Sequence, residues 1–353
     1  MSVEPGLAGA GGAPGAGGSG AVVSAQGSRR RWLPDSSALR FLGRRLGSLL
    51  IVLWVVEIAT FLMVRVMPGD PARQVLGPHA SDQAVAKLRA QLGLDQPLLH
   101  QYIHYTGQVL RLDFGTSFYT HLPVWTELRS RLGAELELIG VAVALILVFG
   151  ITVGVLVGAA TRERRHPAIE RVFVMVTGVI GSVPGYVFAT VLALVFAVTW
   201  KLFPVAGNSG PASVVLPALS IALPYGALLA RIVRVETLGV LAQNYVRSAR
   251  SKRLGRWTIY GRYVLPNVLT AALTLGGTIF TQTVGSAIIV ENVFAWNGIG
   301  LLLTQSVLRL DFPVVQGAAL LLAVIVVVIN ALVDITVSLV DPRSASQRGL
   351  ELG

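Results

Sequence analysis

Long runs without a charged side chain constrain this chain more than any other feature. One of them, from Val172 to Trp200, holds 29 residues, whereas about 20 apolar residues are enough for a helix to cross the hydrocarbon core of a bilayer. Hydrophobic residues make up 53% of the 353 positions and charged residues only 13%, and the mean hydropathy is +0.67. Because a soluble domain carries far more charge, the sequence predicts a polytopic membrane protein with a single domain.

Six apolar segments are predicted to cross the lipid bilayer, so the expected fold class is an all-α bundle of six transmembrane helices. The predicted spans cover about residues 46–66, 138–160, 172–200, 213–233, 270–290 and 313–340. They belong to a transmembrane domain at 39–343, with an extracytoplasmic segment at 67–134 and a basic loop at 236–266. Residues 1–38 are rich in Gly, Ala and Ser, a composition typical of a disordered tail, and 344–353 form a second tail.

The distribution of charge gives an independent orientation. With the amino end inside, 20 of the 29 Lys and Arg residues fall on the cytoplasmic side, and seven acidic residues lie between Asp70 and Glu137 on the other side. This asymmetry is typical of membrane topology signals, so both ends of the chain are predicted to be cytoplasmic. The net charge of +11 does not indicate nucleic acid, because the basic residues cluster between apolar spans and not on one soluble face.

The stretch from Asn244 to Pro266 is a basic, helix-compatible loop between two apolar runs. Such a loop needs a soluble partner or a lipid surface. The alternative is a solvated charge cluster that only keeps the loop inside the cell. The small residues Ser248 and Ala249 favour a partner, because they would let a helix seat in a cleft.

The same stretch resembles the cytoplasmic coupling loop of ATP-binding-cassette (ABC) importer permeases, whose pattern is E-A-A, three residues, G, nine residues, I-x-L-P. Arg247, Ser248 and Ala249 take the E-A-A places, and Tyr263, Leu265 and Pro266 take the I, L and P places. Residues 245–252 are closer still to the first-permease (B-type) chains of the dipeptide/oligopeptide branch. The resemblance implies that eleven residues couple the chain to an ATPase: Tyr245, Val246, Arg247, Ser248, Ala249, Arg250, Ser251, Lys252, Arg253, Leu254 and Gly255.

One position departs from the family pattern. The family glycine falls on Arg253, and a glycine follows two residues later at Gly255. Glycine ends helices because it adopts a positive φ without a steric penalty. We therefore expect the coupling helix to run about two residues longer, or its turn to be reshaped.

Further segments extend the resemblance over residues 40–343. Residues 92–98, 101–102 and 112–117 are similar to extracytoplasmic segments of the peptide-permease branch, and 291–300 is similar to the family's VETVFAWPGLG. The resemblance implies an extracytoplasmic gate or binding-protein contact at Glu291, Phe294, Trp296 and Gly298. A packed extracytoplasmic cap without a binding role is the alternative for segment 67–134.

Two apolar spans contain features that lipid-facing helices do not need. Gly181 to Pro184 interrupts the third span, and membrane helices tolerate such a kink where they line a cavity. The fifth span carries Gln282, Thr283 and Ser286, which either line a translocation path with Pro184 or simply allow close helix packing. Both interpretations remain open.

Ionisable residues inside the predicted spans are rare. Glu57 lies within the first span, where an acidic residue usually faces the bundle interior or an aqueous path. A structural contact between helices is favoured, and a proton relay is the alternative. His100 and His104 have i, i+4 spacing but no carboxylate nearby, so they are expected to be surface residues, and with no Cys in the chain no metal site is expected.

The chain also lacks the motifs of an enzyme. None of the three lysines lies in a G-x-x-x-x-G-K-[ST] loop, and no G-x-S-x-G motif is present. The resemblance therefore implies a transport subunit without its own cofactor, in a multi-pass protein of the bacterial cell membrane. ATP and Mg²⁺ would bind to two partner ATPase subunits, and the other partners would be a second, homologous permease, an extracytoplasmic substrate-binding protein and the lipid bilayer.

The implied function is ATP-driven import of di- or oligopeptides. Nickel complexes or glutathione are alternative substrates within the same branch. Two other classes remain: a secondary transporter that uses Glu57 and Asp334, and a scaffold that assembles without transporting a substrate.

Overall fold

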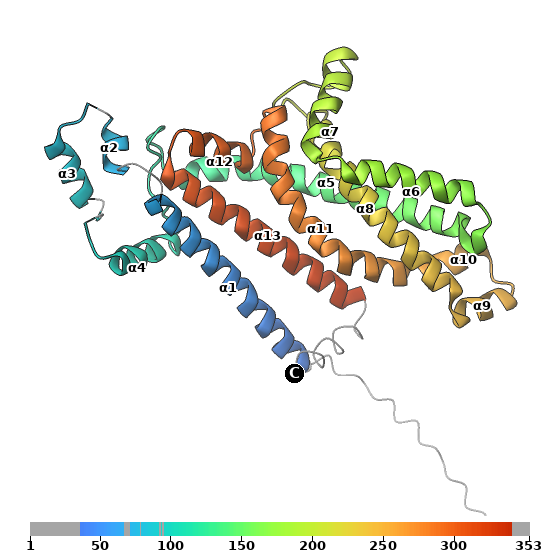
Figure 1. The fold of residues 1–353 in the computed structure, drawn as a ribbon. Helices are drawn as coiled ribbons and strands as arrows, with labels where there is room; N and C mark the ends of the chain where they lie inside the picture. The colour runs from blue at the N-terminus through green and yellow to red at the C-terminus, as the bar shows by residue number, and fades with distance from the viewer. Residues whose placement is uncertain (1–35, 67–70, 78, 92, 94, 341–353) are drawn as a thin grey trace, which may run out of the picture.

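The computed structural model describes residues 36–66, 71–77, 79–91, 93 and 95–340, so the predicted tail at 344–353 and nearly all of the tail at 1–38 lie outside the described residues. In the described part every regular element is helical (Figure 1). The elements are α1 Ser36–Val66, α2 Pro71–Leu76, α3 Asp82–Gln91, α4 Leu98–Val109, α5 Val124–Ala160, η1 Arg162–Arg164, α6 Pro167–Ser182, α7 Gly185–Leu192, η2 Ala193–Thr199, α8 Val215–Ala242, α9 Asn244–Ser251, α10 Arg256–Ile259, η3 Tyr260–Val264, α11 Leu265–Phe294, α12 Ile299–Leu308 and α13 Phe312–Val340. The predicted all-α fold class is confirmed.

Three helices of the described chain, α5, α8 and α13, are each long and apolar enough to cross a bilayer. Two bent pairs raise the number to five if each pair is one span: Pro167–Ser182 with Gly185–Thr199 at 95°, and Arg256–Thr274 with Gly276–Phe294 at 48°. The shorter apolar stretch Leu49–Met63 of α1 falls below the roughly 20 residues that a span needs. The first of the six predicted spans therefore stays a prediction.

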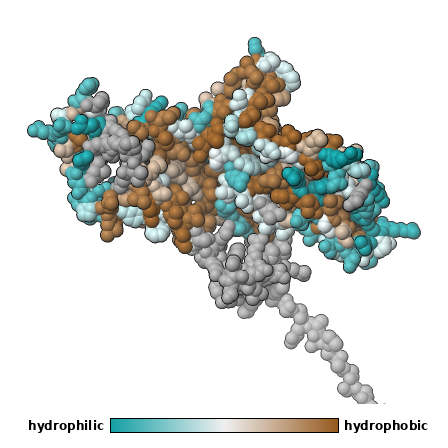
Figure 2. All heavy atoms as spheres, viewed as in Figure 1, coloured by the Kyte–Doolittle hydropathy of each residue, from teal (hydrophilic) through white to brown (hydrophobic). Residues whose placement is uncertain are grey.

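Hydropathy divides the surface into a middle and two ends. Figure 2 shows apolar side chains over the middle of the molecule, with hydrophilic side chains gathered near α3 at one end and near α9 at the other. Large apolar side chains such as Trp54 of α1, Val148 of α5 and Met175 of α6 are exposed. Lipid can cover such a surface, because the bilayer core is as apolar as these side chains.

Helices α5 and α8 pack in close contact through a row of glycines. Gly150, Gly154 and Gly158 follow each other at four-residue spacing on α5, and each faces α8. A Cβ atom on Gly154 would lie only 2.5 Å from Val233 Cγ1 and 2.7 Å from the Ala230 carbonyl oxygen. Small residues at this spacing let two membrane helices approach closely, and α6 lies alongside the same pair (Figure 1).

The segment predicted to be extracytoplasmic is joined to the bundle by polar contacts. The Thr106 hydroxyl on α4 donates a hydrogen bond of 2.6 Å to the buried Glu57 carboxylate on α1, which is an interhelical contact of the favoured kind. The Ser117 hydroxyl donates to Asp311 Oδ2 at 2.5 Å, between α12 and α13. Helix α3 is capped by Ser81, whose Oγ accepts a hydrogen bond of 3.3 Å from the Ala84 amide in the first turn.

Candidate coupling surface and translocation path

The basic loop forms a short helix, α9, that lies against the chain's own core. Val246 is fully buried and Ala249 is only 4% exposed. They pack in one apolar cluster with Leu241 of α8, Ile259 of α10 and Val264 of η3. Ala249 therefore does not face a partner, contrary to the expectation that it seats in a partner's cleft, because its methyl group fills space inside this chain.

The opposite face of α9, the turn after it and one residue of α10 are open to solvent. These exposed residues, which we call the coupling surface, are Tyr245, Arg247, Ser248, Ser251, Lys252, Arg253, Leu254, Gly255 and Trp257. Of the eleven residues that the sequence indicated, Val246 and Ala249 lie on the buried side and Arg250 is half-buried.

Arg253 ends the coupling helix in the conformation that glycine usually supplies. Its φ is 56°, in the left-handed region. The Arg253 amide donates to the Arg250 carbonyl at 2.9 Å, and the Leu254 amide donates to the Ala249 carbonyl at 3.3 Å. These two bonds form a Schellman motif with Arg253 at the C′ position. The helix ends at Ser251, so the expectation that it runs about two residues longer is wrong. Gly255 does not end α9; it has an extended conformation and precedes α10.

Trp257 on α10 was not among the residues that the sequence indicated. It is 92% exposed and directly follows Arg256 in the sequence. An exposed tryptophan in a basic loop is a frequent anchor of protein interfaces. No motif spacing in the sequence singles out Trp257, so only its exposure in the structure identifies it as a candidate contact residue.

A small pocket with three hydroxyl-bearing residues in its lining lies at the break between α6 and α7, where the sequence predicted an interrupted span. It holds about 200 Å³ and is lined by Gly181, Ser182, Val183, Pro184, Gly185, Pro224, Tyr225 and Ser286. The Tyr225 and Ser286 hydroxyl oxygens are 2.7 Å apart, and the Tyr225 hydroxyl also donates to the Gln282 carbonyl at 3.3 Å. Two of the four predicted path residues, Pro184 and Ser286, thus line one pocket.

The other two predicted path residues differ from each other. Gln282 has an exposed side chain and lies next to the pocket through its carbonyl. Thr283 is fully buried, and its hydroxyl donates to the Phe280 carbonyl at 2.5 Å within α11. Thr283 therefore belongs to the helix packing and not to the pocket, whereas Tyr225, which the sequence did not single out, belongs to the pocket.

The four residues expected at an extracytoplasmic contact are buried at the junction of α11 and α12. Glu291, Phe294, Trp296 and Gly298 have almost no exposed surface. The Trp296 indole donates to the Ala134 carbonyl on α5 at 3.0 Å. Buried residues cannot touch a protein docked on the surface in this conformation, so we interpret these four as fixing the junction to α5.

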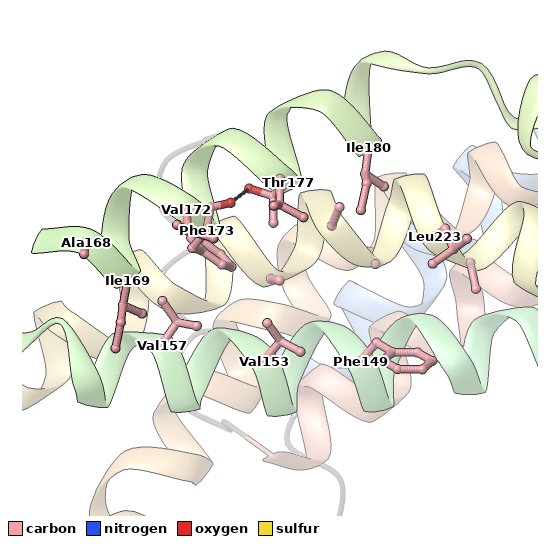
Figure 3. Close-up of a pocket in the computed structure, with 15 residues that line it drawn as sticks. Phe149, Val153, Val157, Ala168, Ile169, Val172, Phe173, Thr177, Ile180 and Leu223 are labelled. Carbon is pink, nitrogen blue, oxygen red and sulfur yellow. Dashed lines mark hydrogen bonds between the residues drawn. The ribbon is translucent and has the colours of Figure 1, made fainter. Parts of the chain in front are cut away.

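A second, wider groove of about 560 Å³ lies along α5, α6 and α8 (Figure 3). Apolar side chains line it, among them Phe149 and Val153 from α5 and Ile169 and Val172 from α6. The Thr177 hydroxyl is occupied by a bond of 2.7 Å to the Phe173 carbonyl. The groove therefore offers no free polar group to a peptide, and the 200 Å³ pocket is the better candidate for a translocation path.

In the described part of the chain, no group of three or more His, Asp or Glu side chains is placed to hold a metal ion. His100 and His104 are exposed on α4, as expected of surface residues. Asp334 is half-buried on α13.

Comparison of the sequence with known proteins identifies its family. Residues 150–346 match the family described as "Binding-protein-dependent transport system inner membrane component", and 38–139 match the N-terminal component of the same system. The chain is 34% identical over 304 residues to the glutathione transport system permease protein GsiC of Escherichia coli (strain K12), covering 86% of this chain and 98% of that one. It is 35% identical over 308 residues to the probable peptide ABC transporter permease protein y4tP of Sinorhizobium fredii (strain NBRC 101917 / NGR234), covering 85% and 97%.

The fold has a counterpart among solved structures. The chain resembles the MetNI methionine ABC transporter in an inward-facing conformation, with a TM-score of 0.50 and 19% identity, covering 61% of this chain and 96% of that one. Together these features define a membrane permease subunit of an ABC importer, which is not itself catalytic. The chain belongs to the family of binding-protein-dependent transport system inner membrane components. Permeases of this kind work in general with ATPase subunits and a binding protein.

Proposed function

We propose that this chain is one of two transmembrane subunits of an ATP-driven importer of short peptides. The two relatives described above are named for glutathione and for peptides. Glutathione is itself a tripeptide, so one substrate class includes both names. Neither of these relatives is named for nickel complexes, the other alternative.

One observation carries the mechanism: a single helix leads from the pocket to the coupling surface. Tyr225 lies at the pocket, and Ala242 is the last residue of α8, with Gln243 alone between it and α9. At 1.5 Å per residue, the two are about 26 Å apart along the helix. A displacement of α9 would therefore reach Tyr225 through one rigid element, with α5 held against it by the glycine row.

The neighbouring helix α6 is also joined to α8 by an ion pair. Arg234 on α8 forms an ion pair of 2.6 Å with Glu170 on α6, and the Arg234 side chain is mostly buried. The Arg234 guanidinium also donates to the Thr161 hydroxyl at the end of α5, at 3.3 Å. Helices α5, α6 and α8 would thus move as a unit at the end nearest the coupling surface.

The coupling surface would dock on an ATPase subunit. Because this chain has no phosphate-binding loop, ATP and Mg²⁺ would bind to two separate ATPase subunits. Arg247, Arg250 and Lys252 would pair with acidic groups on the rim of the docking site, and Trp257 would fill an apolar pocket there. This docking requires the loop that carries the coupling surface to be cytoplasmic, which agrees with six spans and both chain ends inside. The membrane would be the bacterial cell membrane.

Alternating access would follow from this arrangement. ATP binding would close the ATPase pair and displace α9, and α8 would then separate Tyr225 from Ser286 and open the path between the two permeases to the extracytoplasmic side. A binding protein would deliver the peptide there, and hydrolysis would reset the helices. A distant ligand biases a two-state element in such a mechanism.

The test is to express the chain with its chromosomal neighbours, purify the assembly and measure ATP hydrolysis in lipid nanodiscs. We expect a second permease and ATPase chains to co-purify, and hydrolysis to rise when the binding protein is added with peptides. Glutathione and a nickel complex, added separately, compare the substrate classes. Stimulation by the nickel complex alone would contradict the peptide proposal, and purification as a stable homo-oligomer without an ATPase would contradict the importer proposal.

A further inference from the structure

Two carboxylic acids from distant parts of the chain meet in the interior at the junction of α11 and α12. Glu135 lies on α5 and Glu291 near the end of α11, and both side chains are 0% exposed. A buried ionised carboxylate is costly unless it is paired or hydrogen-bonded. The contacts of these two groups therefore decide their charge.

One oxygen of each carboxyl group is held by the first turn of α12. The Ile299 amide donates to Glu135 Oε2 at 2.8 Å, and the Leu301 amide donates to Glu291 Oε2 at 2.7 Å. The amides at a helix N-terminus carry partial positive charge and stabilise a negative charge nearby. This turn is therefore suited to hold one carboxylate.

The second oxygen of each group has no such donor. Glu135 Oε1 and Glu291 Oε1 are both buried, and neither has a hydrogen-bond partner in the described part of the chain. The two carboxyl groups converge on the same turn of α12, two residues apart, which brings their unpartnered oxygens near each other. Two carboxylates cannot hydrogen-bond to each other, because an ionised carboxylate only accepts. A single proton shared by the pair would supply the missing donor.

The backbone encloses the pair. A Cβ atom on Gly298 would lie 2.5 Å from the Glu291 carboxyl atoms, and one on Gly300 would lie 3.0 Å from Glu291 Oε2. The glycines thus bring the chain directly against the carboxyl group. Because glycine has no side chain, nothing at these two positions separates the Glu291 carboxyl group from the turn that holds it.

The charged side chains near the pair do not offset two negative charges. Arg131, one turn before Glu135 on α5, is half-buried, donates to Asn297 Oδ1 and attracts both Glu291 and Glu127. Helix α12 has no ionisable residue. Like charges in contact disfavour ionisation of the second acid, so one shared proton is the consistent state.

We infer that Glu135 and Glu291 form a binding site for one proton, and that the proton-bridged pair fastens the first turn of α12 to α5 and α11. Loss of the proton places two negative charges in contact and releases the junction. The unfolded chain gives up this proton in the ordinary range of a glutamic acid, near pH 4.3, whereas the folded chain retains it. The pair's contribution to stability is therefore present at low pH and falls as the pH rises above that range.

Infrared spectroscopy of the assembled complex in lipid nanodiscs tests this inference without measuring transport. A protonated carboxylic acid has a carbonyl band distinct from that of a carboxylate and shifted in D₂O. We expect the wild type minus Glu291→Gln difference spectrum at neutral pH to show one such band, Glu135→Gln to remove the same band, and alkaline titration of the wild type to abolish it. Glu57→Gln, which changes another buried acid, serves as the control and leaves the band in place.

A second readout does not depend on the variants folding equally well. The unfolding temperature of the wild type is expected to fall as the pH rises from mildly acidic to alkaline, and either Gln variant should flatten that dependence. Absence of a carboxylic acid band in the wild type at neutral pH would overturn the inference, as would a band that neither Gln variant removes. Because neither readout uses a substrate, failure of the peptide proposal would leave this result unaffected.

Discussion

Tyr225 on α8 and Ser286 on α11 join their helices through hydroxyl oxygens 2.7 Å apart, beside the break between α6 and α7. Helix α8 continues from Tyr225 to the start of the coupling helix. This hydrogen bond therefore lies on the element that would carry movement from the ATPase to the pocket.

Tyr225→Phe removes the hydroxyl group and leaves the ring. A hydrogen bond of this kind contributes about 1 kcal/mol, so the variant is expected to fold and to bind the ATPase, because α9 is unchanged. We expect peptide uptake to fall severalfold relative to ATP hydrolysis, as measured in proteoliposomes. Tyr186→Phe, on a half-exposed ring of α7, is the matched control, and an equal loss in both variants would contradict a specific role of Tyr225.

Gly154→Ala is expected to separate α5 from α8. The added methyl group meets Val233 Cγ1 at 2.5 Å and the Ala230 carbonyl oxygen at 2.7 Å, and overpacking of this kind typically costs about 1–3 kcal/mol. The unfolding temperature in detergent should fall, and ATPase stimulation should weaken with it. Gly140→Ala on the same helix meets nothing within 4 Å, so it should leave both quantities unchanged.

Arg253→Gly should be tolerated or slightly stabilising, because Arg253 already has a φ of 56° and a residue with a Cβ pays about 1–2 kcal/mol for that conformation. Greater freedom of glycine in the unfolded chain offsets part of this gain. Arg253→Val should disturb the turn, since a β-branched residue rarely adopts a positive φ. Limited proteolysis of the loop distinguishes the two variants, and equal resistance in both would show that the turn does not depend on residue 253.

Trp257→Ala should weaken binding of the ATPase without changing the stability of this chain. The side chain is 92% exposed, so its removal leaves no cavity. Loss of an aromatic anchor costs on the order of 1–2 kcal/mol of binding free energy, or roughly tenfold in affinity. Trp54→Ala, at an exposed apolar position on α1, should leave the affinity unchanged, and the opposite ranking would place the anchor elsewhere.

The positions of the main elements were predictable from local sequence. Pro184 and its neighbours indicated the interrupted span, because proline cannot continue the backbone bonding of a helix, and α6 indeed ends at Ser182. The end of α9 was not predicted correctly: a longer helix or a reshaped turn was expected because Arg253 replaces the family glycine, but Arg253 itself adopts the positive φ that glycine usually supplies.

The orientations of side chains were not predictable in the same way. Ala249 and Ser248 are both small, and only the packing of α9 against Ile259 and Val264 decides which one is buried. Thr283 and Ser286 lie three residues apart on α11, yet only Ser286 meets Tyr225. Glu135 lies far from Glu291 in sequence, so no local pattern brings these two acids together.

Cysteine labelling at position 248 tests the central claim most directly, because the chain contains no native cysteine. Ser248→Cys places a thiol on the coupling surface, and Ala249→Cys places one on the buried side of the same helix. We predict that a membrane-impermeant maleimide, applied to the purified permeases without ATPase, labels Cys at 248 rapidly and Cys at 249 slowly, and that assembly with the ATPase subunits protects position 248. Equal labelling of position 248 before and after assembly would contradict docking of the ATPase on this surface.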